Sequence, residues 1–102
     1  MGCARILLAD DHQPMLETVA RVLAVDFDVV GAVANGKLAV EAVAALGPDI
    51  VVLDISMPVM GGLEAASLLK QSGSRARVIF LPYKRSPNSW VRRSRPALRV
   101  TF

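Results

Sequence analysis

Short apolar runs alternate with amphipathic stretches along the first eighty residues of the chain. Four of the runs are mainly apolar and short, as strands are, and the run at residues 50–53 is uniformly apolar and β-branched, which is typical of a central strand in a parallel sheet. Three intervening stretches repeat apolar residues every three or four positions, as one face of a helix does. The predicted strands cover residues 5–9, 27–33, 50–53 and 78–81, and the predicted helices cover residues 14–25, 37–46 and 62–72.

Turn and cap residues separate these segments. Pro14 stands where a proline in the first turn of a helix is tolerated. Asn35-Gly36 forms a turn before the second helix, and Gly47-Pro48 is a helix stop signal. Strands that alternate with helices of this length predict an α/β domain, with a parallel sheet and helices on both of its faces.

The pattern stops after Leu81. Residues 82–102 contain three prolines, scattered arginines and no sustained period, so we expect an irregular segment with at most a short strand at 98–102. Charge changes near the same place. Residues 1–74 carry four Lys/Arg and nine Asp/Glu, a net charge of −5, whereas residues 75–102 carry eight Lys/Arg and no acid. We therefore divide the chain into a domain, residues 1–81, and an aberrant basic tail, residues 82–102.

Composition limits the class of protein. The chain has 102 residues, enough for one small domain, and its mean hydropathy of +0.43 allows a packed core. It contains no apolar run of the roughly 18 residues that a membrane span requires. Cys3 is the single cysteine, which excludes an internal disulfide and suits a reducing compartment. These features predict a cytoplasmic protein that does not insert into membranes.

Three acids follow predicted strands. Asp10 and Asp11 end the first strand, and Asp54 ends the third. Ligand sites in open parallel sheets lie beyond the carboxyl ends of the strands, so these acids meet there if the two strands are neighbours. Grouped carboxylates repel one another, and a hard cation such as Mg²⁺ relieves that repulsion. A carboxylate beside Mg²⁺ can also attack a phosphoryl group.

Each feature also has a simpler explanation. An acid pair such as Asp10-Asp11 is often solvated loop charge, and Asp54 alone could cap a helix. His12 is interpreted as a loop or first-turn residue without a role in metal binding. Trp90 among arginines could indicate stacking on nucleic acid, although composition alone is a weak reason for that assignment.

Two stretches in combination are far more specific. ILLADDHQPM is followed some forty residues later by PDIVVLDISMPVMGGLEAASLLK. Together they resemble the receiver domain of bacterial response regulators, over roughly residues 4–81. The resemblance implies a flavodoxin-like (CheY-like) fold with strand order 2-1-3-4-5, which would bring the three acids into one crevice.

The resemblance also implies roles for individual residues. Asp54 would be the phosphoacceptor, and Asp11 would bind Mg²⁺ directly. Asp10 would bind the ion mostly through water, and the backbone carbonyl of Ser56 would complete the protein ligands. Two further residues of the motif, Pro58 and Gly62, would shape the loop that follows the phosphoacceptor.

These roles imply a function in two-component phosphorelay. A sensor histidine kinase would be the phosphoryl donor, and the domain itself would not be an enzyme. The ADDH opening with His12 resembles the subfamily whose receivers precede a LuxR-type helix-turn-helix domain. Contact with DNA would then need a lost or separate domain of that kind, and an intact version could form a homodimer.

The chain departs from the family after Leu81. Pro82 occupies the position of the switch Thr or Ser, and no residue occupies the position of the family's lysine, since Lys84 comes far too early. Read from the third base of each codon, the tail permits a sequence close to the family's approach to its fifth strand. We hypothesise a frameshifted translation of an ordinary receiver, although a sequencing error or a pseudogene would give the same pattern.

The departure has physical consequences. Without a fifth strand, the fourth strand would be a sheet edge, and we expect poor solubility or a molten state. The receiver function would then be impaired. Two alternatives remain: a nucleic-acid-binding protein that uses the basic residues 75–102, and an inactive fragment of a transcriptional response regulator.

Overall fold

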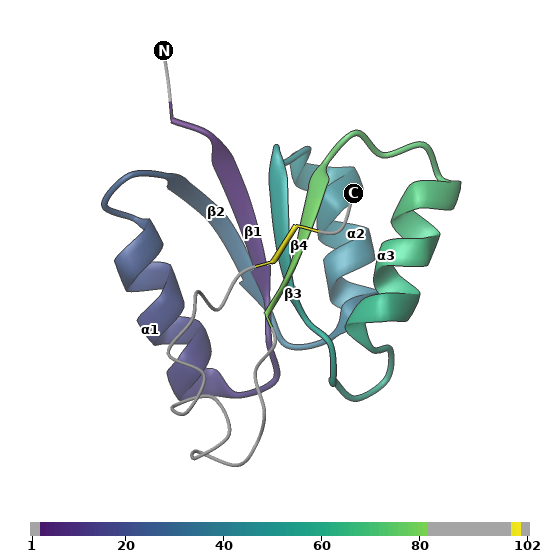
Figure 1. Ribbon diagram of the computed structural model, residues 1–102, viewed down its shortest axis with the longest axis horizontal. Helices are drawn as coiled ribbons and strands as arrows, with labels where there is room; N and C mark the ends of the chain where they lie inside the picture. The colour runs from purple at the N-terminus through teal and green to yellow at the C-terminus, as the bar shows by residue number, and fades with distance from the viewer. Residues whose placement is uncertain (1–2, 82–98, 101–102) are drawn as a thin grey trace.

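The protein folds as a single sheet flanked by helices, in a computed structural model that describes residues 3–81 and 99–100. Strand order is β2-β1-β3-β4-β5. Figure 1 shows α1 on one face of the sheet and α2 and α3 on the other. The elements in chain order are β1 Arg5–Ala9, α1 Gln13–Leu23, β2 Asp28–Val33, α2 Gly36–Leu46, β3 Ile50–Asp54, α3 Gly62–Gln71, β4 Arg77–Leu81 and β5 Arg99–Val100.

Strands β1 to β4 are parallel, as the alternation of apolar runs and helices predicts. β1 pairs with both β2 and β3, and β3 pairs with β4. The register places Asp54 opposite Leu81, so β3 and β4 end together at the lower edge of the sheet in Figure 1. The predicted order of these four strands, and with it the flavodoxin-like fold, is confirmed.

Cap residues fix where the helices begin and end. Nδ1 of His12 accepts from the backbone N–H of Met15, so α1 begins at Gln13, one residue before the predicted start. Oδ1 of Asn35 accepts from the N–H of Leu38 and caps α2. Gly47 has a φ of +59° and ends α2, as predicted. The predicted end of the first helix at residue 25 is wrong by two residues. No helix within residues 3–81 is long and apolar enough to cross a bilayer.

Alternate residues of the strands pack against opposite faces of the sheet. The larger core cluster lies under α2 and α3 and includes Leu7, Leu53 and Phe80. The smaller cluster lies under α1 and includes Leu8, Leu16 and Leu81. In the described part of the chain, α1 alone covers one face of the sheet, whereas α2 and α3 both cover the other face.

The outer edge of β4 differs from the prediction. Val100 pairs with Ile79 and Arg99 pairs with Phe80, in antiparallel direction. The prediction that β4 forms an unpaired edge of the sheet is therefore wrong at Ile79 and Phe80, because a short strand pairs with them. The family's parallel fifth strand is not present among the described residues. The predicted irregular structure of the tail, and the positions of Pro82 and Lys84, fall outside the part of the chain that the structure describes.

Candidate functional site: an acidic cluster at the carboxyl edge of the sheet

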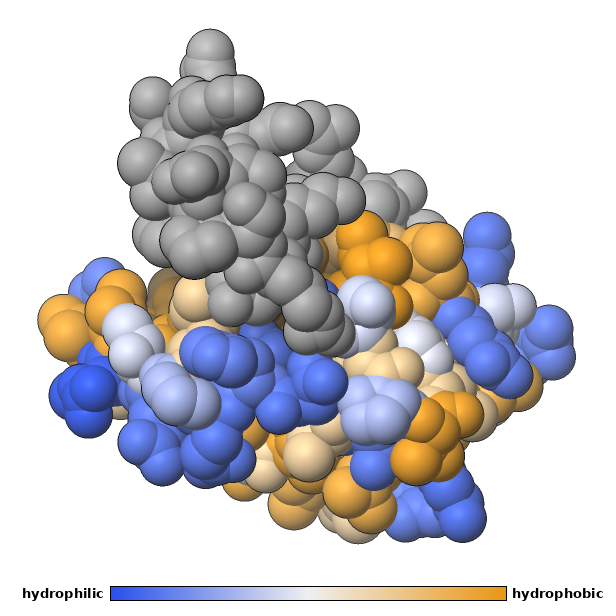
Figure 2. All heavy atoms as spheres, turned by 90° about the horizontal axis from the view of Figure 1, so that it is seen from below, coloured by the Kyte–Doolittle hydropathy of each residue, from blue (hydrophilic) through white to orange (hydrophobic). Residues whose placement is uncertain are grey.

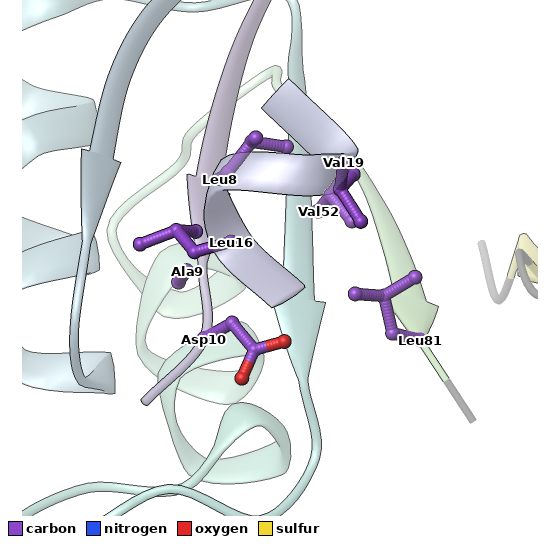
Figure 3. Close-up of a pocket in the computed structure, with 7 residues that line it drawn as sticks. All are labelled: Leu8, Ala9, Asp10, Leu16, Val19, Val52 and Leu81. Carbon is purple, nitrogen blue, oxygen red and sulfur yellow. The ribbon is translucent and has the colours of Figure 1, made fainter. Parts of the chain in front are cut away.

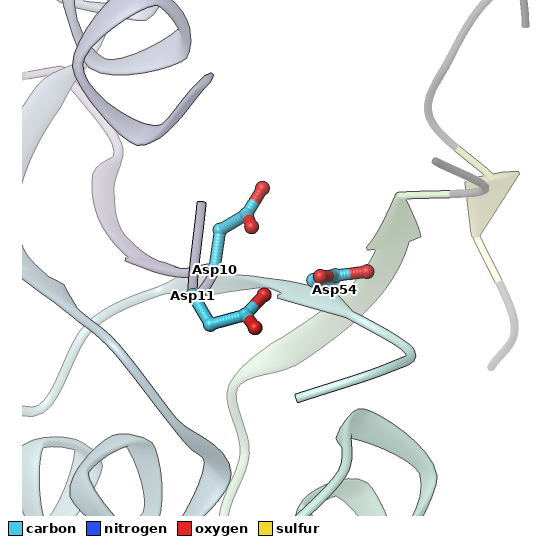
Figure 4. A group of neighbouring side chains, drawn as sticks. All are labelled: Asp10, Asp11 and Asp54. Atoms are coloured by element: carbon cyan, nitrogen blue, oxygen red, sulfur yellow. The ribbon is translucent and has the colours of Figure 1, made fainter. Parts of the chain in front are cut away.

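Asp10, Asp11 and Asp54 meet beyond the ends of β1 and β3. One carboxylate oxygen from each lies within 4.8 Å of the others. Figure 4 shows Asp10 and Asp11 side by side after β1, with their carboxylates directed toward Asp54. The structure thus brings together the three acids that the sequence predicts, because β1 and β3 are adjacent and parallel.

The Asp10 side chain accepts a backbone hydrogen bond at one carboxylate oxygen, and its other carboxylate oxygen has no hydrogen-bond partner in the described chain. Its Oδ1 accepts from the backbone N–H of His12 at 2.9 Å, and its side chain is 2% exposed. Its Oδ2 is buried and has no hydrogen-bond partner among the described residues. Burial raises the pKa of Asp10 above its ordinary value, the His12 N–H and the neighbouring Asp54 side chain lower it, and the charge of Asp11 raises it. A buried carboxylate oxygen without a partner is costly unless a cation or a donor reaches it.

Asp54 shares this environment. It is 2% exposed, and its Oδ1 accepts from the backbone N–H of Ser56 at 3.3 Å. Burial, followed by the negative charge of Asp10, raises the pKa of Asp54 to about 6, while the Ser56 N–H opposes the shift. A group with this pKa carries a substantial charge at neutral pH, in a place where charge is poorly solvated.

The donor set fits a hard divalent cation. All three side chains offer oxygen, which is the ligand atom that Mg²⁺ prefers. An ion among them would give Oδ2 of Asp10 a partner and would offset the repulsion of the three acids. Asp11 is the half-buried member of the group, so it lies closer to solvent than the other two.

The loop after Asp54 is tightly closed on the end of β3. The N–H of Gly62 donates to the carbonyl of Ile55 at 2.9 Å. A Cβ at Gly62 would collide with the backbone carbonyl oxygen of Asp54. These contacts are consistent with a loop-shaping role for Gly62, whereas Pro58 lies in the same loop with its side chain exposed.

Sequence reasoning missed one participant in this loop. It interpreted Gly36 as part of a turn, but the N–H of Gly36 donates to the carbonyl of Met60 at 2.9 Å. The contact joins the start of α2 to the loop after β3. No local pattern in the sequence indicates it, because the two residues meet only through the packing of α2 beside α3.

The surroundings of the acids are mixed in polarity. Asp10 also borders a narrow space between α1 and the sheet, lined by the apolar side chains of Leu8, Leu16, Val52 and Leu81 among others (Figure 3). Figure 2 views the carboxyl edge directly and shows hydrophobic and hydrophilic residues interspersed on it. The Val59 side chain in the loop after β3 is 77% exposed.

Known proteins place this arrangement in a family. The response regulator receiver domain family matches residues 6–94, so the match includes part of the segment after Leu81. The nitrate/nitrite response regulator protein NarL of Escherichia coli K12 is 42% identical over 79 residues, which are 74% of this chain and 36% of NarL. The chain therefore spans about a third of the length of that relative.

Solved structures agree with the sequence comparison. The signal receiver domain of the putative response regulator NarL from Mycobacterium tuberculosis has a TM-score of 0.79 and 30% identity, covering 86% of this chain and 73% of that one. The CheX–CheY–BeF3–Mg²⁺ complex from Borrelia burgdorferi has a TM-score of 0.72 and 29% identity, covering 76% and 60%. By its motifs, its strand order and these relatives, the chain belongs to the response regulator receiver domain family of two-component signalling.

Proposed function

We propose that this receiver accepts a phosphoryl group on Asp54 from a sensor histidine kinase, with Mg²⁺ held by Asp10, Asp11 and Asp54. The observation that carries the proposal is the convergence of three carboxylates within 4.8 Å, with a buried oxygen of Asp10 that has no partner in the described chain. A carboxylate kept beside a divalent cation is a nucleophile suited to phosphoryl transfer.

Each residue has a defined part in the step. An oxygen of Asp54 forms the new bond to phosphorus while the bond to the donor breaks. As the family resemblance implies, Asp11 would hold the ion directly and Asp10 mostly through water, and the Ser56 carbonyl would be a further ligand. Mg²⁺, when bound, neutralises the charge that gathers on the phosphoryl oxygens. The Ser56 N–H already orients Asp54 through its bond to Oδ1.

The relatives support this role by analogy. The Borrelia complex is described as holding CheY with BeF3 and Mg²⁺. The E. coli relative is a response regulator by name. On that analogy the chain acts as a phosphoacceptor and not as an enzyme, and DNA recognition would belong to a separate helix-turn-helix domain.

The phosphate-holding half of the site differs from the family. In the sequence, Pro82 stands where the family has a hydroxyl-bearing switch residue, and no lysine stands at the position of the family's lysine. We therefore expect phosphorylation without the full conformational response, which would leave output impaired.

Labelling by a small phosphodonor tests the proposal. The chain should acquire a hydroxylamine-sensitive acyl phosphate from acetyl phosphate in Mg²⁺ and none in EDTA. Asp54→Asn should abolish the label, whereas Asp26→Asn, an exposed acid in the loop after α1, should retain it. Labelling that Asp54→Asn leaves unchanged would refute the assignment.

A further inference from the structure

The loop after β3 contains a strained turn. The N–H of Met60 donates to the carbonyl of Pro58 at 2.6 Å, which closes a turn of three residues centred on Val59. Val59 has a φ of +68° and is the one non-glycine residue with positive φ in the described chain. A γ-turn with positive φ is rare and strained, and a β-branched side chain increases the strain.

Packing of the Val59 side chain does little to offset this strain. That side chain is mostly exposed, so burial of apolar surface does not hold it. A strained backbone persists only where neighbouring structure fixes it. The restraint must therefore act on the backbone of the turn or of the residues beside it.

The start of α2 supplies such a restraint. Gly36 is buried, and its N–H donates to the carbonyl of Met60, the residue that closes the turn. The first N–H groups of a helix lack partners within the helix, so this donor is available. A Cβ at Gly36 would collide with the Met60 carbonyl oxygen and approach that of Gly61 to 3.0 Å. Only glycine permits this approach without movement of the loop.

The restraint is transmitted toward the acids through a short path. Ser56 precedes the turn and donates its N–H to Asp54, while Gly62 follows the turn and donates to Ile55. A turn that relaxed at Val59 would move the segment between these two bonds. That segment includes the Ser56 carbonyl, which the proposed function assigns to the metal ion.

We infer that Gly36 is a positioning residue, which holds the strained turn at Val59 and thereby sets the loop that orients Asp54 and Ser56. The inference rests on the proposed function for its consequence in metal binding. Its structural core, the dependence of the loop on Gly36 through Val59, stands independently of phosphoryl transfer.

A double-mutant cycle tests this dependence. Gly36→Ala should weaken Mg²⁺ binding by roughly ten- to hundredfold, the range seen when partners that orient metal ligands are changed. Val59→Gly removes the strain, because glycine adopts a positive φ without cost. The turn then no longer depends on the contact with Gly36. In the Val59→Gly background, Gly36→Ala should therefore weaken binding much less, by about threefold or under.

Hydrogen exchange measured without metal accompanies the measurement of Mg²⁺ affinity. In EDTA, Gly36→Ala should lower the hydrogen-exchange protection of the Gly62 amide, and adding Val59→Gly should restore it. Gly47→Ala is the matched control, since Gly47 ends the same helix with positive φ and nothing lies within 4 Å of its missing Cβ. That control should destabilise the protein and leave Mg²⁺ affinity unchanged.

The outcomes separate the two proposals. Equal losses from Gly36→Ala in both backgrounds would overturn the inference, because Gly36 would then act through helix packing alone. Absence of Mg²⁺ binding in the unmodified chain would count against the proposed function, and the exchange data in EDTA would still decide the inference. If Gly36→Ala does not fold, restoration by Val59→Gly supports the inference and failure to restore overturns it.

Discussion

Asp54→Asn should stabilise the metal-free protein, although it removes the proposed phosphoacceptor. The folded state holds Asp54 in a buried position beside Asp10 and Asp11, and the pKa of Asp54 rises from an ordinary 3.8 to about 6. At neutral pH the carboxylate is charged in the folded and the unfolded chain alike. The folded state therefore loses about two pKa units of free energy, or ~3 kcal/mol at about 1.4 kcal/mol per unit.

Replacement by asparagine recovers part of that loss. The amide carries no charge, and its N–H groups are donors close to the carboxylate of Asp10, whose Oδ2 has no partner in the described chain. Burying the amide still costs about 1 kcal/mol where a donor stays unsatisfied. We expect a net gain on the order of 1–3 kcal/mol, which corresponds to a rise of roughly 1 M in the urea midpoint for a chain of this size.

The sign of the pH dependence provides a second check. A raised pKa means that the folded state binds a proton more tightly than the unfolded one, so protonation favours folding. Wild-type stability should fall as the pH rises from about 4 through about 6, and Asp54→Asn should lack this contribution. The difference between the two proteins should be largest near pH 7.5 and should shrink toward pH 5.

The assay is urea denaturation in EDTA, followed by far-UV circular dichroism at pH 7.5 and pH 5. The midpoint is defined for a broad transition as well as a sharp one. Asp26→Asn serves as the control, because Asp26 is exposed and its replacement should shift the midpoint little. A midpoint for Asp54→Asn at or below that of the wild type at pH 7.5 would refute the account of the acid cluster.

Four further expectations follow from the same structure. Millimolar Mg²⁺ should raise the urea midpoint of the wild type and not that of Asp54→Asn; an equal rise in both would indicate that the ion binds elsewhere. Val59→Gly should stabilise the chain by about 1 kcal/mol through relief of strain, and a lowered midpoint would show that the positive φ of Val59 is not costly. The limited cover over α1's face of the sheet should make the 102-residue chain bind a hydrophobic dye at neutral pH and unfold broadly; a sharp, cooperative transition without dye binding would contradict this. Any nucleic-acid binding by the basic residues 75–102 should weaken steeply with salt and persist in Asp54→Asn, and salt-independent binding would exclude that mode.

Much of the fold is readable from local sequence, and the reason is physical. The apolar residues 50–53 of β3 are mostly buried, as a central parallel strand requires. The side chain of Asn35 and the positive φ of Gly47 mark the two ends of α2. The meeting of the acids could be anticipated once the family resemblance implied that β1 and β3 are parallel neighbours, which local sequence alone does not show.

Other features depend on contacts that no local pattern encodes. His12 caps α1 through its ring nitrogen, a role that its residue type does not favour. Gly36 meets Met60 only after α2 and α3 have packed together. The pairing of Arg99 with Phe80 likewise joins segments that are distant in sequence. The sequence allowed a short strand at 98–102 but did not indicate that it would pair with β4 in antiparallel direction.

The direction of β5 limits how this site could be repaired. Along β5 the chain passes from Arg99, opposite Phe80, to Val100, opposite Ile79, and so moves away from the acids. A strand that continued in this direction would approach the amino edge of the sheet. A lysine added there would lie on the wrong side of the molecule to reach a phosphoryl group on Asp54. A parallel fifth strand beside β4 would instead need a crossover connection of a dozen or more residues, as parallel neighbours do.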